Sequence, residues 1–376
     1  MRNDNVIGHN VACLRLDRDV SQDEVASKAS ISRLALGKIE RGEVVPRAAT
    51  LKALAKALGT STTDLVTAVR PLHTVRFRAP KVKGRQQILA EVSRWLEDYC
   101  WLESELKATK TFPLEKLRGL RAKPEALAKR AREEIGLGPK EPIRDICGLL
   151  EDNGIKVLLL DKKSDAFFGL SVSERDGGPA VVVNTWERIS VERWIFTAAH
   201  ELAHLLLHLG EYSRDESEEP KEAEHEADVF ASHFLVPEAA FASEWEEARG
   251  LPLLSAVLKL KRIFRVSYKT VLYRLVETER VTRDVWRDFQ RQHAHYCGKT
   301  LSKADEPNPL KGSEFAWNWS RAGEPAGLSE CDFVEDRLHR LIRRALERKI
   351  ISLGRAAEIL RISREDMRKR AADWAA

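Results

Sequence analysis

The pattern of apolar and polar positions predicts a helical unit at the start of the chain. Apolar residues recur at helical spacing over residues 7–69, with short breaks between the runs. Gly42 and Gly59 each stand where a terminating glycine would follow a helix. Ser21 and Glu24 have the spacing of a capping box, which predicts a helix that begins after Ser21.

The centre of the chain combines short strands with amphipathic helices. An Asp-Gly-Gly turn at residues 176–178 joins two of the strands and predicts a hairpin. Strands are expected at residues 155–160, 167–172 and 180–184, and helices at 91–135, 143–153, about 189–209, 223–237 and, as two helices, 238–280. Residues 283–330 carry tryptophan and proline without periodicity and are expected to be irregular, and residues 331–376 return to a helical pattern.

Composition narrows the class of protein. The chain has 376 residues, of which 43% are hydrophobic and 32% charged, so we expect several globular domains. No apolar run approaches the roughly 18 residues of a membrane span, and residues 1–10 lack the apolar core of a signal peptide. The five cysteines are scattered without a CxxC pair, which favours a reducing compartment. We therefore expect a cytoplasmic protein with no membrane contact.

Charge is unevenly distributed, although the net charge of +5 is modest. Residues 76–85 contain five basic residues and no acidic one, whereas residues 211–226 contain eight acidic residues. Such blocks are usually solvated surface. The basic block follows the N-terminal helical unit directly, which favours contact with phosphate groups.

The predicted helix at 189–209 contains the motif H-E-x-x-H, formed by His200, Glu201 and His204. Positions i and i+4 of a helix share one face, so both imidazoles can bind one metal ion, and Glu201 can reach a water on that ion. A catalytic zinc site uses three protein ligands and a water. A third ligand must therefore come from elsewhere in the chain.

A glutamate on the next predicted helix is the expected third ligand. Leu207 and Gly210 occupy the positions where the metzincin pattern needs glycine and histidine, which excludes that pattern. Glu224 and Asp228 lie four residues apart on one helix face. We expect Glu224 to bind the metal and Asp228 to accept a hydrogen bond from a ligating histidine.

Neighbouring residues leave alternatives open. His225 and Glu226 are rivals of Glu224, although Glu224 lies nearer the apolar side of its helix. His208, one turn beyond His204, is either a further contact or a histidine at a helix end.

If the site is catalytic, the reaction is metal-assisted hydrolysis. Glu201 would act as the general base that accepts a proton from water and passes it to the leaving amine. The run at residues 180–184 could pair with an extended substrate. The candidates for stabilising the oxyanion are Tyr268, Tyr273, Arg274 and His208.

The N-terminal sequence "SQDEVASKASISRLALGKIERGEVVPRAATLKALAKALGTSTTDL" resembles the Xre/Cro-type helix-turn-helix over about 60 residues. It departs at Ala29-Ser30, where a glycine is common in the turn. The resemblance implies that the second helix of the pair enters the major groove. It implies base or phosphate contacts from Gln22, Ser32, Arg33, Lys38 and Arg41, with Arg47 and residues 76–85 near phosphates. The alternative is a protein-binding module of the same fold.

The middle resembles the ImmA/IrrE family of metallopeptidases over roughly residues 140–280. The resemblance rests on "RWIFTAAHELAHLLLH", "EHEADVFASHFLVP" and "FRVSYKTVLYRL". It departs at Asp228, where asparagine is commoner. It implies a peptidase with bound zinc, or manganese, that cleaves a partner transcriptional repressor.

The predicted architecture is an α+β multidomain chain with an all-α helix-turn-helix domain, a zincin-like α+β peptidase domain with a small sheet, and a helical C-terminal region. The domains are expected at residues 1–69, 70–135 (a basic linker and helical connector), 136–282 and 283–376. We expect two partners, operator DNA and a protein substrate that is a transcriptional repressor. We also expect a homodimer, because such units usually read two half-sites.

Two other readings of the whole chain remain open. In one, the protein is a non-catalytic transcription factor or antitoxin-like repressor whose metal domain is a sensor or scaffold. In the other, the helix-turn-helix only recruits a protein substrate. The tail at 331–376 also resembles a helix-turn-helix segment, which could be a second DNA element, a docking surface or a helical cap. The cluster "HAHYC" at 293–297 is attributed to chance.

Overall fold

The computed structural model divides the chain into two compact units. The first unit comprises Met1–His73 and Ala79–Asp98, and the second comprises Thr74–Arg78 and Tyr99–Ala376. The structure describes residues 5–18, 20–67, 70, 72–77, 84–120, 122–208, 221–302, 305–308 and 327–375. Most of the basic block at 76–85 and most of the acidic block at 211–226 lie outside these described residues.

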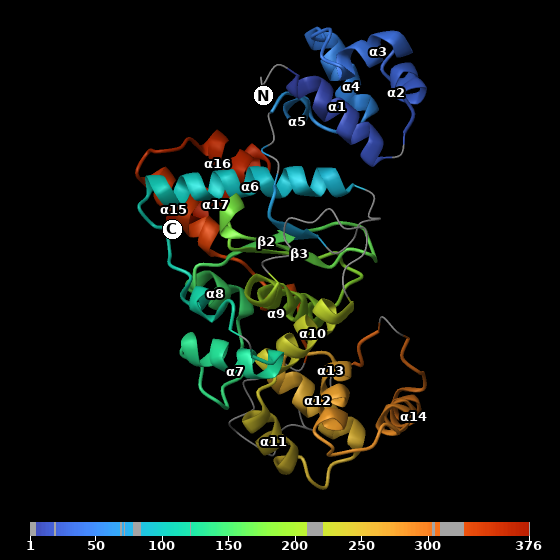
Figure 1. Ribbon diagram of the computed structural model, residues 1–376, viewed down its shortest axis with the longest axis vertical. Helices are drawn as coiled ribbons and strands as arrows, with labels where there is room; N and C mark the ends of the chain where they lie inside the picture. Colours follow the sequence, from blue (N-terminus) through green and yellow to red (C-terminus); the bar gives the residue numbers. More distant parts are fainter. Residues whose placement is uncertain are drawn as a thin grey trace. The chain divides into compact units, whose positions relative to one another are not determined.

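The first unit is helical, as predicted (Figure 1). Its helices are α1 (Val6–Asp17), α2 (Gln22–Lys28), α3 (Arg33–Glu40), α4 (Ala48–Ala57), α5 (Thr62–Val66) and the first part of α6 (Arg85–Glu105). Val11, Leu36, Leu54 and Leu65 are fully buried between α1, α3, α4 and α5. The hydroxyl of Ser21 accepts the amide of Glu24, so the predicted start of α2 is confirmed.

The turn between α2 and α3 adopts the backbone conformation that glycine favours. Ser30 has a φ of 56°, in the left-handed region. A residue with a Cβ costs about 1–2 kcal/mol there. The amide of Ile31 donates to the carbonyl of Ala26 and closes the turn at 3.0 Å. The absence of a glycine at Ala29-Ser30 therefore raises the energy of the turn but leaves its geometry unchanged.

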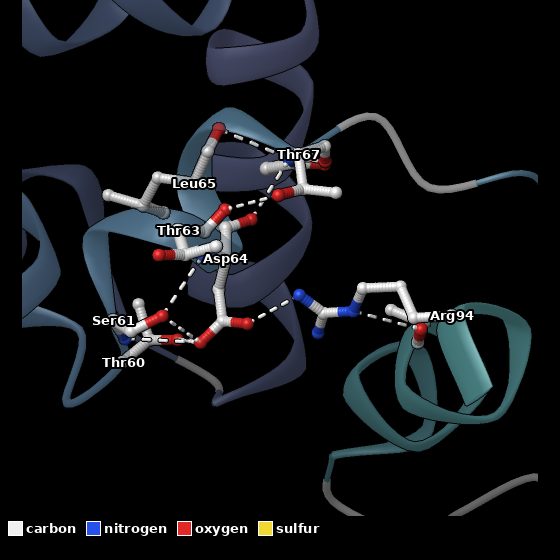
Figure 2. Close-up of polar contacts among 9 residues, drawn as sticks. Thr60, Ser61, Thr63, Asp64, Leu65, Thr67 and Arg94 are labelled. Carbon is white, nitrogen blue, oxygen red and sulfur yellow. Dashed lines mark hydrogen bonds and ion pairs between the residues drawn. The ribbon is translucent and has the colours of Figure 1, made fainter. Parts of the chain in front are cut away.

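Asp64 joins α5 to α6 within the first unit (Figure 2). Its carboxylate accepts hydrogen bonds from the hydroxyls of Thr60 and Ser61, both at 2.8 Å, and lies 2.5 Å from a guanidinium nitrogen of Arg94. Burial alone would raise the pKa of Asp64, but these hydrogen bonds outweigh burial and lower it to about 2. The charged form of Asp64 therefore stabilises this unit.

The second unit contains a mixed sheet of order β1-β3-β4-β2. Its strands are β1 (Val75–Phe77), β2 (Lys156–Leu160), β3 (Gly169–Val172) and β4 (Ala180–Asn184). β2 and β4 are parallel, and β3 is antiparallel to both β4 and β1. The predicted strands and the hairpin around Gly177 are confirmed, whereas β1 arises from the segment that we expected to be a linker.

Helices complete the second unit (Figure 1). They are η1 (Pro113–Leu117), α7 (Pro124–Glu134), α8 (Ile146–Asp152), η2 (Glu174–Asp176), α9 (Val191–Leu207), α10 (Lys221–Leu235), α11 (Glu238–Glu247), α12 (Leu253–Phe264), α13 (Tyr268–Glu277), α14 (Val285–Cys297), η6 (Glu330–Asp332), α15 (Arg337–Glu347), α16 (Leu353–Leu360) and α17 (Arg364–Ala375). No described helix is long and apolar enough to span a membrane.

Three of these helical regions differ from the sequence prediction. Residues 91–135 form separate elements because Pro113 and Pro124 each begin a new one, as proline lacks the N–H of a helix interior. Residues 238–280 form three helices, since Pro252 starts α12. The segment at 283–330, expected to be irregular, contains α14, whose buried Val285 and Phe289 lie one turn apart.

The main core lies between the sheet and the helices α9 and α10. Figure 1 shows α9 beside the sheet, with α10 next to α9. Val181 and Val183 of β4, Leu202 of α9, and Phe230 and Phe234 of α10 are all fully buried in this core. The H-E-x-x-H helix is therefore held from two sides.

Buried charged residues join the C-terminal helix α15 to the rest of the second unit. The carboxylate of Glu151 accepts the amides of Asp336 at 3.1 Å and Arg337 at 2.9 Å, at the start of α15. Burial raises the pKa of Glu151 to about 7 despite these two hydrogen bonds. Glu103 pairs with both Arg337, at 2.5 Å, and Lys156, at 3.2 Å.

Replacing Asp64 by Asn is expected to destabilise the first unit by about 1 kcal/mol at pH 7, because the ion pair is partly exposed and solvent screens it. The folded pKa lies below the unfolded value of 3.8, so the stabilisation is present above pH 3.8 and is lost as the pH falls towards 2. Hydrogen exchange of the α5 amides measures this change. Asp23→Asn, at an exposed pair, is the control; equal protection in both variants would contradict the prediction.

Candidate metal centre and nucleic-acid interface

His200 and His204 lie one turn apart on α9 and are both buried. Ser190 caps this helix, since its side chain accepts the amide of Arg193. The two Nε2 atoms are 2.8 Å apart and point to one place. Two imidazole nitrogens therefore converge within the core.

Helix α10 brings a carboxylate to the same place. The Glu224 oxygens lie 3.8 Å from His200 Nε2 and 3.4 Å from His204 Nε2. One ligand atom from each of the three residues lies within 4.8 Å of the others. Two imidazole nitrogens and a carboxylate oxygen form a donor set that suits zinc with one position left open. The residues present thus fit the metal that the sequence suggested.

Asp228 lies behind the first histidine. Its Oδ1 is 2.8 Å from Nδ1 of His200. A proton on Nδ1 would be donated to this carboxylate, and Nε2 would then keep a lone pair for a metal ion. Asp228 is thus placed to fix the tautomer and the ring orientation of His200.

Glu226 and His208 form a second polar chain behind the other histidine. His208 Nδ1 lies 2.9 Å from Nδ1 of His204, and His208 Nε2 lies 3.0 Å from Oε2 of Glu226. Glu226, the rival of Glu224 in the sequence, therefore contacts His208 and is outside the three-residue cluster. His225 is exposed.

Glu201 is completely buried between α9 and β3. A Cβ added at Gly169 of β3 would lie 3.3 Å from Cγ of Glu201 and only 2.6 Å from a methyl carbon of Thr197. It would also lie 2.7 Å from the carbonyl oxygen of Val182. Glycine therefore permits β3 to approach the H-E-x-x-H helix closely, beside the predicted general base.

Arg76 lies at the candidate centre, although the sequence did not predict it there. It is 4% exposed on β1, and its Nη2 lies 3.6 Å from Oε1 of Glu224. Arg76 pairs with Ser171 and Ser171 with Val181, so all three face the α9 side of the sheet. The alternation of Val75, Arg76 and Phe77 was a signal for a strand, but the surrounding basic residues made it resemble a linker.

The residues expected to stabilise an oxyanion differ in their burial and in their contacts. Tyr268 is buried and stacks on Phe289 at 4.9 Å. Arg274 is fully buried and donates to Glu238 at 2.9 Å and to the carbonyl of Val236. Tyr273 is 44% exposed, and burial, then the carboxylates of Glu277 and Asp228, raise the pKa of its hydroxyl.

The strand that we expected to pair with a substrate has no open edge. β4 lies between β3 and β2 and makes ladder hydrogen bonds on both sides. Strand addition at residues 180–184 is therefore excluded, and this expectation was wrong. Only the outer strands of such a sheet can accept another chain.

The helix α3 presents basic side chains to solvent in the first unit. Arg33, Lys38 and Arg41 are exposed, and Leu34 between them is 68% exposed. Arg33 lies 3.5 Å from Asp23, and Arg41 lies 2.5 Å from Glu43. Such exposed pairs are weak, so a phosphate can compete for either guanidinium.

Two other predicted DNA-contacting residues have structural partners. The hydroxyl of Ser32 accepts the amide of Ala35 and caps α3. The amide of Gln22 donates to Glu40 at 2.6 Å, and Glu40 also binds Arg15 at 2.7 Å. Ser32 therefore retains its hydroxyl proton for donation, whereas Gln22 is held by Glu40.

Comparison with known proteins agrees with both parts of this description. Residues 150–276 match the family model described as an IrrE N-terminal-like domain, which is a peptidase family. Residues 14–65 match the helix-turn-helix family model. The class of the protein is therefore a helix-turn-helix DNA-binding regulator fused to a metallopeptidase-like domain.

A known regulator is similar to the N-terminal part of the chain. An uncharacterized HTH-type transcriptional regulator, y4dJ, from Sinorhizobium fredii is 40% identical over 62 residues, which are 16% of this chain and 80% of that protein. The chain belongs to the HTH-type transcriptional regulators. Among solved structures, the apo form of ComR from S. thermophilus covers 78% of this chain and 95% of its own, with 12% identity and a TM-score of 0.16, too low to carry an argument. The predicted fold class and both family resemblances are confirmed.

Replacing Gly169 by Ala is expected to lower the melting temperature of the second unit by roughly 2–6 °C, because the new methyl group clashes with Thr197 and a backbone carbonyl. Differential scanning calorimetry measures the change. Gly138→Ala is the matched control, since its Cβ would meet its nearest atom at 3.5 Å. If Gly169→Ala has the same melting temperature as the parent, β3 does not pack closely against α9.

Proposed function

We propose that this protein is a DNA-binding transcriptional regulator whose IrrE-like domain is a zinc-dependent endopeptidase that cleaves a partner repressor. The observation that supports the proposal is the convergence of His200, His204 and Glu224, with ligand atoms within 4.8 Å, beside the buried Glu201. Manganese is compatible with the same nitrogen and oxygen donors.

The residues have distinct roles in this proposal. His200, His204 and Glu224 would hold the metal, and Asp228 would orient His200. Zinc held there would supply Lewis-acid chemistry, which lowers the pKa of a bound water and polarises a carbonyl. Glu201 accepts a proton from the attacking water and delivers it to the nitrogen of the leaving amine. Glu201 is buried from solvent, and exclusion of water would strengthen its electrostatic part in this transfer.

The helix-turn-helix would bring this activity to an operator. Arg33 and Lys38 lie on the exposed face of α3, where base edges would be read, and Arg41 lies near its end for a phosphate contact. We propose that Ser32 and Gln22 contribute at the starts of α3 and α2. Two copies of the chain would bind two half-sites as a homodimer.

Replacing Glu201 by Gln is expected to reduce cleavage by a factor of roughly 10²–10⁴ and to leave metal content and DNA binding unchanged. The purified variant is incubated with helix-turn-helix repressors encoded beside its gene, and cleavage is followed on gels. Metal content is measured by mass spectrometry. DNA binding is measured by fluorescence anisotropy at two salt concentrations, using DNA upstream of its own gene.

Glu222→Gln, an exposed change on α10, is the matched control and should cleave like the parent. If the parent cleaves no repressor while parent and Glu201→Gln regulate transcription equally, the metal domain is a sensor or scaffold. Cleavage without any salt-dependent DNA binding would instead identify the helix-turn-helix as a device for substrate recruitment.

A further inference from the structure

We infer that β1 occupies the sheet edge at which an extended protein substrate would pair, so that Val75–Phe77 are an intramolecular occupant of the peptide site. The inference rests on the proposed peptidase function and adds the site and chemistry of substrate recognition. The partner that fits is an extended segment with a basic residue between an aliphatic and an aromatic one.

The outer edge of β3 is the edge nearest the candidate centre. Gly169 of β3 packs against Thr197 and Glu201 of α9. β4 is paired on both sides, and β2 is separated from β3 by β4. An uncovered β3 would offer unpaired N–H and C=O groups beside Glu201, which is how extended peptides are bound by strand addition.

The register directs β1 along this edge towards Glu201. Val75 pairs with Val172, Arg76 with Ser171 and Phe77 with Leu170. The next residue of β3 is Gly169, so the antiparallel ladder advances in the direction of the H-E-x-x-H helix. β1 therefore follows the path that a bound peptide would take.

The side chains of β1 define what the edge accepts. Arg76 faces the metal cluster, with its guanidinium 3.6 Å from the carboxylate of Glu224. Phe77 faces the other side of the sheet and packs edge-on against Phe167, with ring centroids 5.1 Å apart. A basic residue is thus matched by the acidic side of the site, and an aromatic residue by an apolar one.

A hydrogen-bonded latch holds β1 from outside the ladder. Asp176 accepts the amide of Thr74 at 2.5 Å and its hydroxyl at 2.8 Å. Ser173 donates its hydroxyl to Thr74 at 2.8 Å. Asp176 is buried in η2 and is not one of the three residues of the metal cluster. Removing its carboxylate should loosen β1 and leave the candidate centre in place.

The test measures binding in trans of a fluorescent peptide with the sequence of residues 75–80, VRFRAP, which lacks Thr74 and therefore makes no contact of the Thr74 latch. Full-length Glu201→Gln is the background, so that no cleavage occurs, and zinc is present throughout. Asp176→Ala in this background is expected to bind the peptide at least 10-fold more tightly by fluorescence anisotropy. A peptide with alanine in place of Arg76 should lose most of that gain.

Asp165→Ala, at an exposed carboxylate, is the matched control and should leave peptide affinity unchanged. If Asp176→Ala loses its fold by near-ultraviolet circular dichroism, Thr74→Val is used instead. It removes the two hydrogen bonds of the Thr74 hydroxyl, keeps the amide bond to Asp176, and should give a smaller gain in the same direction. Equal affinity in the folded latch variant and its background would overturn the inference and make β1 an ordinary structural strand. Because peptide binding needs no turnover, this outcome is independent of whether the proposed cleavage occurs.

Discussion

The packing of α10 on α9 is the constraint on which the candidate centre depends. Ala227, Phe230 and Phe234 are fully buried on α10, and they hold the helix where Glu224 reaches both histidines. Buried imidazoles are costly unless each nitrogen finds a partner. Here the far nitrogens of His200 and His204 lie beside Asp228 and His208, so the near nitrogens are left to face the carboxylate.

The sheet brings two further residues to the candidate centre. β3 approaches α9 through Gly169 and confines Glu201, while β1 carries Arg76 to Glu224. Thr74–Arg78 belong to the second unit, although the residues before and after them belong to the first. The chain therefore contributes one short segment, which contains β1, to the second unit before the first unit is complete.

The sequence predicted the parts of the site that depend on local spacing. Residues four apart on a helix share a face whatever surrounds them, so His200 could be placed beside His204, and Glu224 beside Asp228, in advance. Arg76 could not, because its position depends on a three-residue strand that pairs with residues almost 100 positions later. The chain from His204 through His208 to Glu226 was hidden for the same reason, since it requires the mutual placement of two helices.

The most direct test of the account is calorimetric titration of metal-free protein with zinc. The account predicts one bound zinc per chain, a loss of at least 100-fold in affinity for Glu224→Gln, and a much smaller loss for Glu226→Gln, which acts on His204 only through His208. Absence of zinc binding by the parent chain, or loss of binding in Glu226→Gln with retention in Glu224→Gln, would contradict it.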